Sequence, residues 1–129
     1  MSQTLKAIVV EDDGVVAESL ACTLRDLGHE VCGVAADVLD MTSLLQAHRP
    51  DVVVLDLNLG KLHEGVGVAT ALQAAGPIPI VFIANAVTED QRKDIRALDA
   101  AALVLQPVTP ETLRIGIALA VKRSQDAQV

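Results

Sequence analysis

Acidic residues follow two strongly apolar segments, and their types and spacing indicate chemistry. Asp56 comes directly after the apolar run 52–55, and Glu11 and Asp12 come directly after the run 7–10. Such runs, rich in β-branched residues, predict strands buried on both faces of a parallel sheet. Open sheets of this type bind ligands at the carboxyl ends of their strands. Two strands that both end in carboxylates therefore predict one anionic pocket that binds a divalent cation.

The rest of the chain alternates between short apolar runs and segments in which apolar residues recur at helical spacing. Strands are predicted at 5–10, 31–35, 52–55, 78–84 and 101–105, and helices at 15–27, 66–75, 89–98 and 110–122. A further helix is predicted between its cap, Asp37, and the break at Arg49-Pro50. Right-handed crossovers turn such a series into a parallel sheet with helices on both faces, an α/β fold. We expect a single domain over 1–129, with an ordered core of about 5–122 and a frayed tail at 123–129.

Helix boundaries are marked by local signals. Gly28 occupies the position after a helix where a left-handed conformation is favoured. Thr88 and Gln91 have the spacing of a capping box, and Thr109 precedes a proline as an N-cap should. Asp13 also fits an N-cap, and we favour that role over metal binding.

Composition excludes several functional classes. The net charge of −7 argues against binding a nucleic acid backbone, and Phe82 is the only aromatic residue available for base stacking. No apolar run is long enough for a membrane span, and the amino terminus lacks a secretory signal, so a cytoplasmic location is expected. Cys22 and Cys32 match neither a redox nor a zinc pattern, which predicts buried, reduced thiols.

The sequence resembles the receiver domain of two-component response regulators over nearly its whole length. The resemblance is carried by the acids after the first strand, by Asp56 after the third, by Pro79 before the fourth, and by the segment 106–111 after the fifth. It implies a flavodoxin-like, doubly wound, five-stranded parallel sheet of order 2-1-3-4-5 with five helices.

The resemblance also implies a phosphoryl switch. Asp56 would accept a phosphoryl group from a histidine kinase or a phosphotransfer protein, and a downstream protein would sense the change. Mg²⁺ would be held by Glu11, Asp12, Asp56 and the backbone carbonyl of Asn58. Physical chemistry agrees, because a carboxylate that attacks an anionic phosphoryl group is repelled unless a hard cation bridges the two.

Four positions depart from the family pattern. Ala84 stands where the family has Thr or Ser, Asn85 replaces a small residue, Leu103 replaces an aromatic residue, and Gln106 replaces lysine. A shift of one residue in the strand end would bring Asn85 into the donor role, so Ala84, Asn85 and Gln106 are all candidates for contacting the phosphoryl group. Without the lysine, the like charges raise the pKa of at least one carboxyl group, and the site should depend more strongly on Mg²⁺.

Rival functions follow from the same departures. A pseudo-receiver, acting as a phosphorylation-independent interaction module, is the main alternative. A phosphatase with an aspartyl intermediate ranks last, because such enzymes pair the nucleophile with an acid two residues on, where this chain has Asn58. Residues 65–70 imitate a dinucleotide fingerprint but lack its third glycine. His63 lies in the loop beyond Asp56 and could approach the site.

The last predicted helix is apolar on two sides. Ile117 lies on the face expected to pack on the sheet, whereas Ile115 and Leu119 lie on nearly the opposite side. A second apolar face favours a partner in addition to the core. A homodimer through this helix is therefore predicted.

Overall fold

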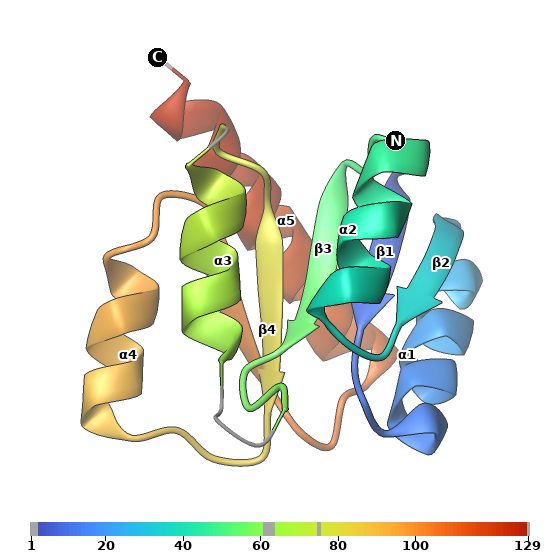
Figure 1. Cartoon of the computed structure of the whole chain (residues 1–129), viewed down its shortest axis with the longest axis horizontal. Helices are drawn as coiled ribbons and strands as arrows, with labels where there is room; N and C mark the ends of the chain where they lie inside the picture. The colour runs from blue at the N-terminus through green and yellow to red at the C-terminus, as the bar shows by residue number, and fades with distance from the viewer. Residues whose placement is uncertain (1–2, 61–63, 75, 129) are drawn as a thin grey trace.

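The computed structural model describes residues 3–60, 64–74 and 76–128, which contain five strands and five helices in alternation (Figure 1). The strands are β1 Lys6–Val10, β2 Glu30–Ala35, β3 Val52–Asp56, β4 Ile80–Ala84 and β5 Ala101–Leu105. The helices are α1 Gly14–Asp26, α2 Val38–Ala47, α3 Gly65–Gln73, α4 Glu89–Arg96 and α5 Pro110–Ala127. Every predicted segment is confirmed in type, and His63 lies outside the described residues.

The strands form one parallel sheet in the order β2-β1-β3-β4-β5, which confirms the predicted flavodoxin-like, doubly wound fold. In the register of β1 and β3, Val10 lies opposite Leu55. In the register of β3 and β4, Asp56 lies opposite Ile83. All strands run in one direction, so their carboxyl ends meet at one edge, at the bottom of the view in Figure 1.

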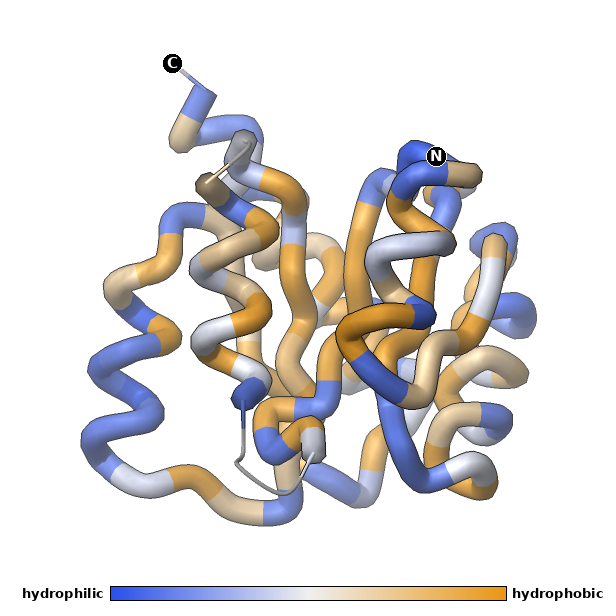
Figure 2. Tube along the Cα trace, viewed as in Figure 1, coloured by the Kyte–Doolittle hydropathy of each residue, from blue (hydrophilic) through white to orange (hydrophobic). Residues whose placement is uncertain are grey.

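Helices cover both faces of the sheet, and the strands form the hydrophobic centre of the molecule (Figure 2). On one face, Val54 packs in a cluster with Leu20 of α1 and Leu113 of α5. On the other face, Phe82 and Ile95 belong to a second cluster, to which α2, α3 and α4 all contribute. Each such side chain contributes about 1.5–3 kcal/mol by its burial, which stabilises the sheet that positions the residues at its edge.

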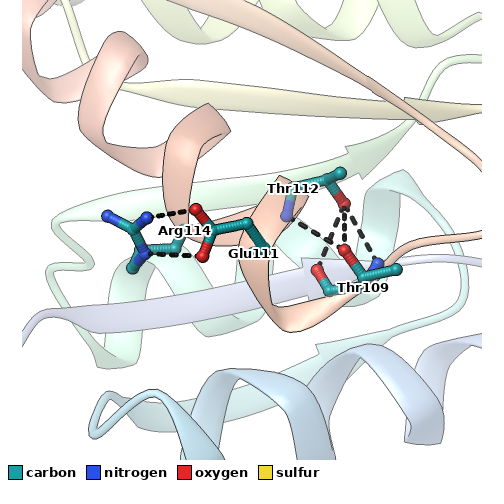
Figure 3. A network of polar contacts seen from close by, with 4 residues as sticks. All are labelled: Thr109, Glu111, Thr112 and Arg114. Carbon is teal, nitrogen blue, oxygen red and sulfur yellow. Dashed lines mark hydrogen bonds and ion pairs between the residues drawn. The ribbon is translucent and has the colours of Figure 1, made fainter.

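The predicted helix ends are confirmed. Asp13 caps α1, and Gly28 adopts a left-handed φ of 92° after it. Thr88 and Gln91 form the capping box of α4. At the start of α5, Thr109 and Thr112 bond reciprocally (Figure 3).

The prediction of a frayed tail from residue 123 is wrong, because α5 continues to Ala127. Tertiary contacts hold the added turns in place: the Arg123 guanidinium donates to the carbonyl oxygens of Ala101 at 2.6 Å and Leu98 at 3.4 Å. The Ser124 hydroxyl donates to the carbonyl oxygen of Pro77. At 18 residues α5 is the longest described helix, and none of the described helices is long and apolar enough to cross a bilayer.

The two cysteines are free thiols, but their predicted burial is wrong. Cys22 is exposed on α1, since the buried stripe of that helix runs through Leu20, Ala21 and Leu24 instead. Cys32 is half-buried in β2, at the edge of the sheet.

Candidate functional site

Parallel register brings the predicted acids together at the carboxyl edge of the sheet. Glu11 follows β1, Asp56 ends β3, and these two strands are neighbours. One carboxylate oxygen from each of Glu11, Asp12 and Asp56 can be chosen so that all three lie within 4.8 Å of one another. Three carboxylates at this spacing form a hard, anionic oxygen donor set of the kind that Mg²⁺ prefers, so the residues fit the predicted cation.

The three acids differ in environment. Glu11 is buried, with only 7% of its surface exposed, whereas Asp56 is half-buried and Asp12 is exposed. Burial, and next the neighbouring charge of Asp56, raise the pKa of Glu11 from 4.5 to about 7, although a hydrogen bond from the Asp13 amide opposes the rise. Removing a carboxylate from water and placing it beside like charges both favour its protonated form. A bound cation would reverse this preference.

Asp13 has a different role from the acids beside it. Its Oδ1 accepts hydrogen bonds from the Val15 amide at 2.9 Å and from the Val16 amide at 3.1 Å. These bonds satisfy two of the free amides at the start of α1. The prediction that Asp13 is an N-cap is therefore confirmed.

The backbone after β3 orients Asp56. The Asn58 amide donates to Asp56 Oδ1 at 3.0 Å, and the Leu59 amide donates to the Asp56 carbonyl oxygen at 3.2 Å. In the described part of the chain, no backbone amide donates to the Asn58 carbonyl oxygen. The predicted carbonyl ligand belongs to the same turn that holds the Asp56 carboxyl group.

A cavity of about 180 Å³ opens beside these acids. Its lining combines acids, amides and apolar residues: Glu11, Asp13, Val16, Asp56, Asn58, Ile83, Ala84, Asn85 and Gln106. Two larger depressions, of about 610 and 540 Å³, lie elsewhere on the molecule. Among the residues that the structure describes, neither depression gathers a cluster of carboxylates, so chemistry rather than size identifies the site.

All three predicted phosphoryl-contacting positions line this cavity. Ala84 is the last residue of β4, is buried, and offers no side-chain donor. Its carbonyl oxygen accepts a hydrogen bond from the Gln106 amide at 2.8 Å, which ties the ends of β4 and β5 together. Asn85 and Gln106 are among the lining residues, and each has a carboxamide with N–H donors in place of the family's hydroxyl and ammonium groups.

Sequence reasoning missed part of this site. Val16 and Ile83 form apolar walls of the cavity, and no local signal distinguishes them from ordinary core residues. Gln91, predicted only as part of a helix cap, also donates from Nε2 to Asn58 Oδ1 at 3.4 Å. The two residues are 33 positions apart, so only the fold brings them into contact.

Comparison with known proteins agrees with this geometry. Residues 7–118 match the family described as the response regulator receiver domain. The chain is 27% identical over 121 residues to the transcriptional regulatory protein PdtaR of Mycobacterium tuberculosis, covering 94% of this chain and 58% of that protein. It is 31% identical over 103 residues to protein-glutamate methylesterase/protein-glutamine glutaminase 5 of Anaeromyxobacter dehalogenans, covering 79% of this chain and 28% of that protein. The chain thus spans less than two thirds of each of these relatives.

Solved structures show the same fold. The signal receiver domain of a modulated diguanylate cyclase from Desulfovibrio desulfuricans G20 superposes with a TM-score of 0.82 at 25% identity, covering 97% of this chain and 99% of that one. The response regulator PhyR from Brucella abortus superposes with a TM-score of 0.80 at 23% identity, covering 98% of this chain and 51% of that one.

Proposed function

Because the chain belongs to the response regulator receiver domain family, we propose that it accepts a phosphoryl group on Asp56 and signals through protein contacts. The observation that carries this proposal is the convergence of Glu11, Asp12 and Asp56 within 4.8 Å at the carboxyl edge of the sheet. These carboxylates and the Asn58 backbone carbonyl would hold Mg²⁺. The proposed donor is a histidine kinase or a phosphotransfer protein, in the cytoplasm.

The proposed reaction is an in-line transfer. An ionised Asp56 oxygen attacks phosphorus, the bond from phosphorus to the donor nitrogen or oxygen breaks, and the donor leaves with that electron pair. The Asn58 amide, at 3.0 Å from Asp56 Oδ1, orients the carboxyl group for attack. Amides of Asn85 and Gln106 would donate to the phosphoryl oxygens. Mg²⁺, when bound, supplies the positive charge that offsets repulsion between the carboxylates and the phosphoryl group.

The output is proposed to be a change in a protein-binding surface on α4, β5 and α5. Ile115 and Leu119 are 53% and 49% exposed, as expected for a second apolar face of α5. Beside Leu119, Arg92, Arg96 and Arg123 surround a small cavity of about 170 Å³. Three arginines therefore gather around one cavity in a protein of net charge −7, and Arg96 also pairs with Glu89 at 3.3 Å. We propose that this surface forms a homodimer contact or binds a downstream protein.

A second function, that of a pseudo-receiver with a constitutive binding surface, is favoured by one feature of the site. Ala84 is buried at the end of β4 with no hydroxyl to bind a phosphoryl oxygen, and Leu103 in β5 has no hydroxyl either. The family's residues at these two positions, which would couple the phosphoryl site to the binding surface, are therefore replaced, although the three carboxylates of the site are retained. A phosphatase remains a weaker alternative, because Asn58 occupies the place of its second acid.

The test is incubation of the protein with acetyl phosphate and Mg²⁺, followed by mass spectrometry of intact protein and peptides. We expect one added phosphoryl group on Asp56, which is absent from Asp56→Asn. Beryllofluoride with Mg²⁺ should form an equivalent non-covalent complex, which NMR would detect. If neither reagent modifies the native chain, the pseudo-receiver function replaces the phosphoacceptor.

A further inference from the structure

A hydrogen bond joins the turn after Asp56 to the first turn of α4. The Gln91 side-chain amide donates from Nε2 to Asn58 Oδ1 at 3.4 Å, and both residues are half-buried. The bond therefore lies partly out of water, at the edge of the sheet where the acids converge. It connects two segments, β3–α3 and β4–α4, that are separate in the sequence.

The Gln91 end of this bond is fixed by the helix cap. Gln91 Oε1 accepts a hydrogen bond from the backbone amide of Thr88 at 2.9 Å, and the backbone amide of Gln91 donates to Thr88 Oγ1 at 3.1 Å. A carboxamide is planar, so holding its oxygen also sets the direction of its nitrogen. The capping box thus aims Nε2 at Asn58 and lowers the entropy lost in forming the bond.

The Asn58 end of the bond leads to the acceptor. The Asn58 amide donates to Asp56 Oδ1 at 3.0 Å, and its backbone carbonyl is the proposed fourth ligand of Mg²⁺. Turning the Asn58 residue would move both groups together. A restraint on its side chain therefore also limits the movement of the backbone amide that bonds to Asp56 and of the proposed carbonyl ligand.

We propose that Gln91 is a positioning residue for the acceptor site. It acts through Asn58 without contacting the cation or the phosphoryl group, and this proposal rests on the function proposed above. Because binding energies are coupled in both directions, a cation at the site would in turn steady the first turn of α4. In a chain with Ala84 and Leu103 at the usual coupling positions, this carboxamide provides a route from Asp56 to α4.

The first test uses metal-free protein, so that it does not depend on phosphorylation. Backbone amide exchange of Asn58 is measured by NMR in the native chain, in Gln91→Ala and in Gln73→Ala. Gln73 is the matched control, because its Nε2 also donates to a carbonyl, that of Ile78 at 3.1 Å, away from the acids. We expect Asn58 exchange to rise about two- to tenfold in Gln91→Ala and to stay unchanged in the control.

The second test is Mg²⁺ titration of the same proteins, with Thr88→Ala and Asn58→Ala added. Gln91→Ala should weaken Mg²⁺ binding about two- to tenfold. Thr88→Ala should weaken Mg²⁺ binding less, because this change weakens the helix cap but leaves the side-chain amide of Gln91 in place. The double variant Asn58→Ala/Gln91→Ala should bind no more weakly than Asn58→Ala, because the two changes break one bond.

Unchanged Asn58 exchange and Mg²⁺ affinity in Gln91→Ala would overturn the proposal, as would equal effects from Gln73→Ala or Thr88→Ala. The proposal would also be overturned if the losses of Mg²⁺ affinity in Asn58→Ala and Gln91→Ala simply added in the double variant. If the native chain binds neither Mg²⁺ nor beryllofluoride while Asn58 exchange still responds to Gln91→Ala, the phosphoacceptor function fails and the positioning role of Gln91 stands.

Discussion

Glu11 and Asp56 present carboxylate oxygens within 4.8 Å of each other at the ends of two neighbouring parallel strands. One of these acids is buried and the other is half-buried. Two causes therefore raise the pKa of Glu11, which are its loss of water and the neighbouring charge of Asp56. The behaviour of the site in solution should follow from this pairing.

The first prediction concerns pH. The pKa of Glu11 is raised from 4.5 to about 7 in the folded protein, so folding takes up a proton between these values. The contribution of Glu11 to stability is therefore fully present below pH 4.5 and is lost as pH rises through about 7.

Mg²⁺ requires the ionised carboxylate, so its affinity should increase between about pH 6 and about pH 8, with proton release on binding. Calorimetric titrations in buffers of different ionisation enthalpy measure both quantities. Glu11→Gln should remove most of the pH dependence, and an affinity that is constant with pH would contradict this assignment.

The second prediction concerns Gln106. Replacing it by lysine would place a cation in the cavity that Glu11 and Asp56 also line. Gln106→Lys should weaken Mg²⁺ binding and reduce the dependence of phosphorylation on Mg²⁺, because the ammonium group offsets part of the negative charge. Gln106→Ala, which removes the amide without adding charge, is the control. Equal phosphorylation of the native chain with and without Mg²⁺ would rule out a site that depends on Mg²⁺.

The third prediction concerns Ala84. Ala84→Thr adds a hydroxyl at the cavity wall, and we expect phosphorylation by acetyl phosphate to become faster by about tenfold or more. Ala84→Val has nearly the same shape without the hydroxyl, so it separates hydrogen bonding from size. Both variants should be less stable by about 1–3 kcal/mol, since Ala84 is buried. Equal rates for the two variants would show that the hydroxyl contributes nothing.

The fourth prediction concerns the start of α5, which follows Gln106 closely. Thr109 Oγ1 accepts from the Thr112 amide at 3.1 Å (Figure 3). Thr109→Ala should lower the free energy of unfolding by about 1 kcal/mol, measured by urea denaturation. Thr42→Ala, within α2, should be neutral or slightly stabilising, because that hydroxyl bonds to its own helix, at the Val38 carbonyl.

The fifth prediction concerns self-association. Replacing Ile115 and Leu119 by serine should weaken a homodimer in sedimentation experiments and leave stability within about 0.5 kcal/mol, because both side chains are exposed. Leu39→Ser, at an equally apolar exposed position on α2, should have no effect on association. A native protein that stays monomeric at high concentration, with and without beryllofluoride, would exclude the dimer.

The sequence by itself determined the features that depend on local chemistry. Apolar runs such as 52–55 specified buried parallel strands, because a strand covered on both faces needs an apolar side chain at every position. The capping roles of Asp13, Thr88 and Thr109 were readable because a cap bonds within a few residues of itself. The acids at the strand ends were readable for a related reason, since parallel strands end at one edge.

Only the tertiary structure decided what depends on contacts between distant segments. Arg123 and Ser124 bond to other parts of the fold, and these contacts hold the last turns of α5 in place. No local signal in the sequence of the tail predicts such contacts. The raised pKa of Glu11 required its burial beside Asp56, and the bond from Gln91 to Asn58 required β3 and β4 to be neighbours. Burial and long-range hydrogen bonds arise from packing, and packing is a property of the whole chain rather than of any segment of it.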